Sequence, residues 1–202
     1  MDRISVAIDG PGGAGKSTIA KEMASRFGFI YVDTGAIYRT VGLKARRAGV
    51  DAHSADAVVP LLDTIQIEMK YDDTGLQRMY LDGEDVSDEI RLPEISMYAS
   101  AVSAIPQVRA FLLEMQRAMA REHSVIMDGR DIGTVVLPDA GVKIFLTASP
   151  EARAKRRYDE LAAKGVACTL EEVMSDLLRR DKNDSERAAA PLRQAEDAVL
   201  VD

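Results

Sequence analysis

A glycine-rich run from Gly10 to Ser17 carries the strongest chemical signal in this chain of 202 residues. It reads Gly-Pro-Gly-Gly-Ala-Gly-Lys-Ser, which fits the phosphate-binding loop pattern of a glycine, four free positions and then Gly-Lys-Ser. In such a loop the backbone amides close on phosphate oxygens and the lysine reaches the β- and γ-phosphates. The serine hydroxyl binds the magnesium ion that bridges them. The run therefore predicts that Lys16 and Ser17 bind a nucleoside triphosphate together with its metal ion.

A chance glycine-rich turn would match the same pattern, but the flanking segments argue against it. Residues 3–9 are a short apolar run typical of a strand, and Ile19, Met23 and Phe27 recur at helical spacing from Lys16 onwards. A phosphate loop needs this order of strand, loop and helix, because the helix N-terminus adds positive potential at the phosphates.

The remainder of the chain alternates between predicted strands and predicted helices. Strands are expected over 29–33, 124–128, 142–146 and 198–201, and helices over 35–48, 93–104, 106–119, 150–163 and 169–180. The segments 65–69 and 79–81 flank an Asp-Thr-Gly turn and indicate a small antiparallel hairpin, inserted into this alternation. The pattern predicts an α/β fold in one domain, with a parallel five-stranded sheet flanked by helices. Ligands are then expected beyond the carboxyl ends of the strands.

Polar clusters lie where these strands end. Residues 33–39 follow the second strand, residues 128–131 follow the third, and residues 179–187 form a dense charged run. Arginines directly after buried strands are expected to face the ligand crevice, whereas a single arginine elsewhere is more simply a solvated surface charge. Phosphoryl transfer depends on positioning and charge neutralisation rather than on a protein nucleophile, so such a set of arginines would suffice.

Composition excludes several other classes of protein. The net charge of -7 argues against a general binder of nucleic acid or of anionic membranes. Hydrophobic residues make up 47% of the chain, too many for a disordered protein, yet no run reaches the ~18 apolar residues of a membrane span. Cys168 is the single cysteine and suits a reducing compartment, and the two histidines, His53 and His123, are too few for a zinc site. Residues 1–3 lead directly into a predicted strand, so no secretory signal peptide is expected.

Four motifs, taken together, resemble those of bacterial cytidylate kinases, which are P-loop nucleoside monophosphate kinases. They are the phosphate loop, then Asp-Thr-Gly-Ala-Ile-Tyr-Arg, then Leu-Asp-Gly-Glu-Asp-Val-Ser, then Asp-Gly-Arg-Asp-Ile-Gly-Thr-Val-Val, and they span most of the chain in the right order. The resemblance implies a CORE that carries a monophosphate-binding insertion at about 60–105 and a mobile LID at about 151–167. It also implies transfer of the γ-phosphate of ATP to CMP or dCMP, giving CDP or dCDP and ADP, with Mg²⁺ as the metal.

The resemblance assigns roles position by position. The ATP phosphates are assigned to Gly10, Pro11, Gly12, Gly13, Ala14, Gly15, Lys16, Ser17 and Thr18. The acceptor phosphate is assigned to Arg39, Arg130 and Arg187, with Thr34 and Tyr38 in the same substrate site. The cytosine ring is assigned to Ser100, Arg109 and Asp131, and the sugar to Arg180 and Asp184. The LID arginines are Arg153, Arg156 and Arg157, and the catalytic set is Lys16, Arg130, Arg153 and Arg157.

Further expectations concern the setting of the protein. A cytoplasmic monomer is expected, acting on small molecules and on neither nucleic acid nor membranes. The family continues into a final helix, which we expect to be absent from a chain that ends at Asp202. The alternatives are a P-loop kinase for another small acceptor, a nucleotide-dependent switch such as a GTPase, and a catalytically silent nucleotide-binding module. The chain has no Asn-Lys-x-Asp guanine reader, and its intact lysine, serine and arginine set argues against the silent module.

Overall fold

The central element is a sheet of five strands in the order β2-β6-β1-β7-β8, and every neighbouring pair runs parallel. The computed structural model describes residues 3–163 and 165–202, so the predicted start at Met1-Asp2 and position 164 of the predicted LID range lie outside it. The strands are β1 (Ser5–Asp9), β2 (Ile30–Asp33), β6 (Val125–Gly129), β7 (Val142–Leu146) and β8 (Val199–Val201). All five predicted strands and the predicted fold class are confirmed.

The strands end level with one another, which fixes the place of the site. In the register, Asp9 pairs with Gly129 and Asp33 pairs with Asp128. The polar residues that follow β1, β2 and β6 therefore meet at one edge of the sheet.

The helices that lead away from these strand ends form largely where the sequence predicts them. They are α1 (Lys16–Phe27), α2 (Thr34–Arg47), α6 (Pro150–Ala163) and α7 (Leu170–Glu186). The expected end of the last helix at residue 180 is wrong, because α7 continues to Glu186. Its N-terminus is fixed by a capping box between Thr169 and Glu172, and its charged final turns are largely exposed except for Asp184, which is buried.

The segment between α2 and β6 forms a second layer. It contains α3 (Ala55–Val58), the 3₁₀ turns η1 (Val59–Asp63) and η2 (Glu89–Arg91), α4 (Pro93–Ser103) and α5 (Pro106–Glu122). The predicted hairpin is present as β3 (Ile67–Tyr71) and β4 (Gln77–Leu81), and it is extended by a short strand β5 (Glu84–Asp85). Met79 and Leu81 of the hairpin share one large core with Ile37 of α2 and Leu112 of α5.

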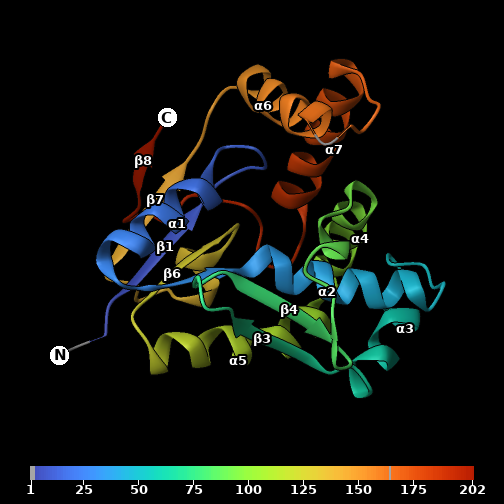
Figure 1. Cartoon of the computed structure of the whole chain (residues 1–202), viewed down its shortest axis with the longest axis horizontal. Helices are drawn as coiled ribbons and strands as arrows, with labels where there is room; N and C mark the ends of the chain where they lie inside the picture. The colour runs from blue at the N-terminus through green and yellow to red at the C-terminus, as the bar shows by residue number, and fades with distance from the viewer. Residues whose placement is uncertain (1–2, 164) are drawn as a thin grey trace.

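Figure 1 shows α6 and α7 side by side at the top of the view, away from the hairpin. They enclose a small core of their own that contains Ala154, Leu161 and Val173. This pair of helices is therefore packed as a unit distinct from the large core. None of the helices in the described ranges is long and apolar enough to cross a membrane.

The segment after β6 forms a π-helical turn, η3 (Ile132–Val136), which the sequence analysis did not predict. The backbone carbonyl of Asp131 accepts from the amides of Val135 and Val136, so the turn begins directly after the fourth motif's Asp131. Such wide turns often lie at functional sites.

Candidate active site

The phosphate-binding loop runs from the end of β1 into α1. Gly10 has φ 148°, and a Cβ there would lie 1.9 Å from the carbonyl oxygen of Leu146, so no other residue fits. Gly15 caps α1 in a left-handed conformation, which frees the first turn of the helix to face a ligand. The Nζ of Lys16 donates to the carbonyl of Pro11 at 2.8 Å and is buried. Burial and the nearby charge of Arg130 lower the pKa of Lys16. Bound phosphate oxygens would stabilise the charged form of the lysine and so raise its pKa again.

At the base of this loop, Ser17 and Asp128 bring together two oxygen atoms that could both bind a metal ion. The Ser17 hydroxyl donates to Asp128 at 2.6 Å, and the Tyr31 hydroxyl donates to the other carboxylate oxygen at 3.1 Å. Burial and the charge of Asp33 raise the pKa of Asp128, so a cation beside it would favour the ionised form. Hydroxyl and carboxylate oxygens are ligands that suit Mg²⁺, and Ser17 and Asp128 therefore fit a metal site.

Asp33 gathers two arginines at the end of β2. Its carboxylate accepts from the amide of Ala36 and so caps α2, and it pairs with Arg39 at 3.1 Å and with Arg91 at 2.7 Å. Burial raises the pKa of Asp33, but the two guanidinium groups outweigh it, and the pKa is lowered overall. The Nε of Arg39 is buried and has no hydrogen-bond partner among the described residues, so this arginine keeps one donor free for an anion.

A second group of arginines surrounds Asp184 of α7. Arg130 donates to Asp184 at 2.8 Å, and Arg187 approaches the same carboxylate to 4.0 Å. Arg180 has a buried Nε with no partner in the described part of the chain, and burial together with the charge of Arg130 lowers its pKa to about 10. Cations crowded in this way favour a bound anion.

Asp131 is the centre of a third cluster, buried between two arginines. Arg109 of α5 contacts one carboxylate oxygen, and Arg187 donates to the other at 3.3 Å. The ring of Tyr38 lies 5.4 Å from the guanidinium carbon of Arg109, close enough for a cation–π contact. Ser100 lies at the border of this cluster, with its hydroxyl 3.5 Å from Asp184.

The α6 arginines differ in where they point. Arg153 is buried and donates to the carbonyl of Gly12 at 3.0 Å and to Asp181 at 2.5 Å. Arg156 lies 3.4 Å from the carbonyl of Ala14. Arg157 instead pairs with Glu160 of its own helix at 3.1 Å on a partly exposed surface. The structure therefore brings Arg153 and Arg156 to the phosphate loop, but not Arg157.

Most of the predicted site residues lie close together at the carboxyl edge of the sheet, the place where a ligand crevice is expected in this fold, and this region is called the crevice below. The hydroxyl of Thr34, which was predicted to contact the substrate, instead donates to the carbonyl of Asp128 at 2.7 Å, and the residue is buried. Arg187, predicted beside Arg39 at the acceptor phosphate, contacts Asp131 and lies between the second and third clusters.

Sequence reasoning gave no role to five residues of the crevice, which are Asp9, Asp33, Arg91, Asp128 and Asp181. Asp9, Asp33 and Asp128 could have been found, because each lies at the carboxyl end of a predicted strand. Arg91 and Asp181 could not, because their partners Asp33 and Arg153 are distant in sequence.

Comparisons with known proteins bear on the family of this chain. The sequence profile described as cytidylate kinase matches residues 6–202. A cytidylate kinase of Caldicellulosiruptor bescii is 52% identical over 202 residues, which cover 100% of this chain and 89% of the relative. A cytidylate kinase of Geobacter sulfurreducens is 53% identical over 197 residues, which cover 98% of this chain and 84% of the relative.

Among solved structures, an uncharacterized protein from Eubacterium ventriosum matches with a TM-score of 0.50 and 13% identity, covering 99% of this chain and 89% of that chain. At that identity the likeness bears on the fold alone. The sequence matches span nearly the whole chain, and they confirm the resemblance drawn from its four motifs: the chain belongs to the cytidylate kinase family.

Proposed function

We propose that this chain transfers the γ-phosphate of ATP to CMP or dCMP, giving CDP or dCDP and ADP. Its family membership supports this reaction. One observation in the crevice carries it: the phosphate loop with Lys16 opens onto the same strand ends as Asp131, a buried carboxylate held by Arg109 and Arg187. A donor site and a site able to read a base therefore share one crevice.

On the donor side, the amides of the loop from Gly10 to Thr18 bind the phosphates of ATP. Lys16 offsets the negative charge that develops on the transferring group. Ser17 and Asp128 would hold Mg²⁺, directly or through a water molecule, since their oxygens already lie 2.6 Å apart. When bound, the metal ion supplies further neutralisation of the phosphate charge.

On the acceptor side, Arg39 and Arg130 bind the phosphate of CMP. Both are partly buried at adjacent strand ends, and each is oriented by a carboxylate, Arg39 by Asp33 and Arg130 by Asp184. Guanidinium groups fixed in this way suit bidentate binding of phosphate. We assign the sugar to Arg180 and Asp184, which lie next to this phosphate site.

Asp131 and Arg109 distinguish cytosine from uracil. Cytosine offers an amino group as donor and an unprotonated ring nitrogen as acceptor, whereas uracil offers the reverse pair. The carboxylate of Asp131 accepts from the amino group and Arg109 donates to the ring nitrogen, with Ser100 beside them. Uracil would set its carbonyl against the carboxylate of Asp131 and its ring N–H against the guanidinium of Arg109, and sites with such mismatched groups discriminate strongly.

Arg153 and Arg156 close the donor site from α6. Their contacts with the carbonyls of Gly12 and Ala14 place two guanidinium groups directly over the loop. Closure there excludes water, so that the phosphoryl group reaches the acceptor rather than solvent. We propose that the LID covers about 151–167 and that the acceptor-binding insertion covers about 60–105. Arg157 pairs with Glu160 and does not contact the loop, so its catalytic role stays a prediction.

We also propose that the protein works as a cytoplasmic monomer on small molecules. The single cysteine and the net charge of -7 support this setting. A direct test of the function follows products in a mixture of protein, ATP, Mg²⁺ and CMP. Equal amounts of CDP and ADP are expected, and a chelator should stop both. ADP formed without CDP would contradict the proposal.

A further inference from the structure

The outer edge of β2 is covered by two side chains of the hairpin. Among the strands that the structure describes, β2 is the last on its side of the sheet and pairs only with β6. Backbone groups of alternate residues on such a strand point away from its neighbour and need other partners. The hydroxyl of Tyr71 donates to the carbonyl of Tyr31 at 2.9 Å. Two residues further along β2, the backbone of Asp33 is hydrogen-bonded to the side chain of Gln77. Tyr71 and Gln77 face each other across the β3–β4 register.

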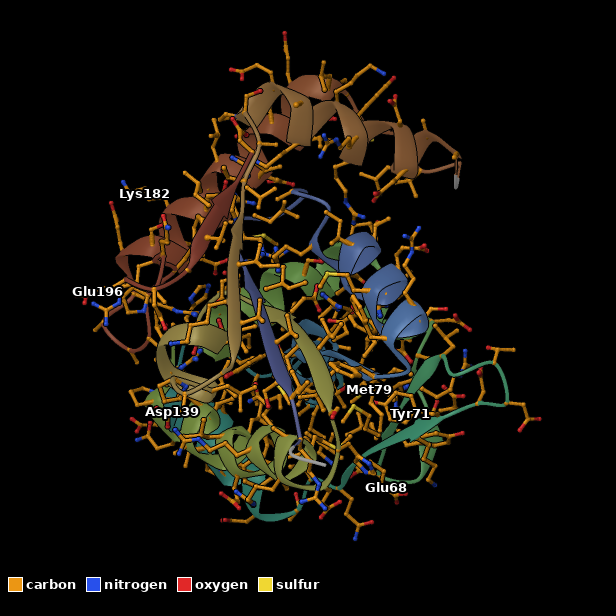
Figure 2. The ribbon with its side chains drawn as sticks, turned by 90° about the vertical axis from the view of Figure 1, so that its left-hand side faces the viewer. Glu68, Tyr71, Met79, Asp139, Lys182 and Glu196 are labelled. Atoms are coloured by element: carbon orange, nitrogen blue, oxygen red, sulfur yellow. The ribbon has the colours of Figure 1, made fainter. Side chains whose placement is uncertain are left out.

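Gln77 satisfies both backbone groups of Asp33 with one side chain. Its carbonyl oxygen accepts from the Asp33 amide at 2.8 Å, and its amide nitrogen lies 3.3 Å from the Asp33 carbonyl. The side chain is buried, with a residue exposure of 7%. It therefore replaces one rung of a missing neighbouring strand. Figure 2 labels Tyr71 together with Met79, the residue whose sulfur lies 3.2 Å from the Gln77 amide.

Asp33 is the residue through which this contact reaches the acceptor site. Its carboxylate caps α2 and pairs with Arg39 and with Arg91, and both arginines lie at the crevice. A small rotation of the Asp33 backbone would move the carboxylate and the Arg39 guanidinium with it. The residue that fixes this backbone comes from the hairpin, 44 positions away in sequence.

We propose that Gln77 is a positioning residue for the acceptor phosphate, acting through Asp33 on Arg39. The inference rests on the proposed function, in which Arg39 binds the phosphate of CMP. Arg39 holds that phosphate in both the ground state and the transition state, so misplacing it weakens binding more than it slows the bound complex.

The test replaces Gln77 by methionine, which keeps the volume and removes both hydrogen bonds. The KM for CMP is expected to rise about tenfold while kcat at saturating CMP stays within about twofold and the KM for ATP is unchanged. Calorimetric titration with CMP alone should show the same loss of affinity. Tyr71→Phe is the matched control, because it removes a hydrogen bond from the same hairpin to the same strand without touching Asp33.

A double mutant shows whether Gln77 acts through Arg39. In an Arg39→Met background, Gln77→Met should raise the KM for CMP by less than about twofold, because the guanidinium group that Gln77 positions is no longer present. An equal rise in both backgrounds would overturn the proposal. So would an unchanged KM in Gln77→Met, or an equal rise in Tyr71→Phe, which would make the hairpin's attachment alone responsible.

Two further results keep the outcome clear. If Gln77→Met does not fold, Gln77→Leu also removes both hydrogen bonds with an apolar side chain, and it should raise the KM for CMP. An unchanged value there would also overturn the proposal. Wild-type protein that makes no CDP would instead refute the proposed function, which separates the two failures.

Discussion

Replacing Asp131 by asparagine separates base reading from simple support of the neighbouring arginines. Asp131 is 4% exposed, and its carboxylate holds two buried guanidinium groups, those of Arg109 and Arg187. Asparagine has nearly the same shape but keeps only one acceptor oxygen, so one of the two arginines loses its partner. Breaking a buried ion pair in this way is expected to lower the free energy of unfolding by about 3 kcal/mol.

The effect on catalysis follows from the same loss. A hydrogen bond to a charged group contributes about 1–3 kcal/mol, so kcat/KM for CMP should fall about 5- to 160-fold. UMP should suffer less, because the asparagine amide can donate to the uracil carbonyl that the carboxylate repels. The ratio of the CMP and UMP efficiencies should therefore fall at least about fivefold.

The assay measures ADP release with each acceptor, alongside thermal unfolding to establish that the variant is folded. Asp139→Asn is the matched control, since Asp139 is an exposed carboxylate eight positions further along the chain, labelled in Figure 2. It should change neither the ratio nor the stability. If Asp131→Asn folds and its CMP-to-UMP ratio equals that of the wild type, Asp131 only supports its arginines and does not read the base.

Three further predictions concern the donor site, α6 and β1. Lys16→Ala should lower kcat about 10²- to 10³-fold without unfolding the protein, because it removes one donor to the transferring group, and a folded variant that keeps a third of its rate would contradict that role. Amide exchange in α6 should slow when both nucleotides are bound, because Arg153 and Arg156 then hold phosphates as well as loop carbonyls, and equal exchange with and without nucleotides would refute closure. Burial raises the pKa of Asp9 from 3.8 to about 6, so the folded state keeps a proton that the unfolded state loses over this range. The stability of wild type relative to Asp9→Asn should therefore fall by about 2 kcal/mol as the pH rises from about 4 to about 6, which chemical unfolding at several pH values would measure, and a flat difference would contradict it.

Local patterns were enough to predict the elements on which the site is built. The five strands show as short apolar runs, and α1 shows as a helical repeat between Gly15 and Gly28, so both were visible in the sequence. The extension of α7 was not visible, because residues 179–187 are a charged run with no apolar helical repeat. Only the fold shows that Asp184 is buried and that Arg130 neutralises it.

The motifs located the crevice and one pair of residues inside it, but not the other pairs. Arg109 and Asp131 were assigned to one base-reading site, and the structure places them in contact. The contacts of Arg153 with Asp181 and of Gln77 with Asp33 join segments far apart in sequence, so no local pattern encodes them. The same holds for Arg157: three neighbouring arginines share one face of α6, and only the structure shows that Arg157 pairs with Glu160 while Arg153 and Arg156 contact the loop.

The most direct test of the central claim measures ADP release from ATP with CMP, dCMP, UMP, AMP and GMP as acceptors, and with none. The crevice predicts that CMP and dCMP give the highest kcat/KM, that UMP is weaker, and that AMP and GMP are poor, because Asp131 and Arg109 match the hydrogen-bonding groups of cytosine. Without an acceptor, ADP release should be slow. Faster turnover with AMP or GMP, or equal ATP hydrolysis with no acceptor, would contradict the assignment of this chain as a (d)CMP kinase.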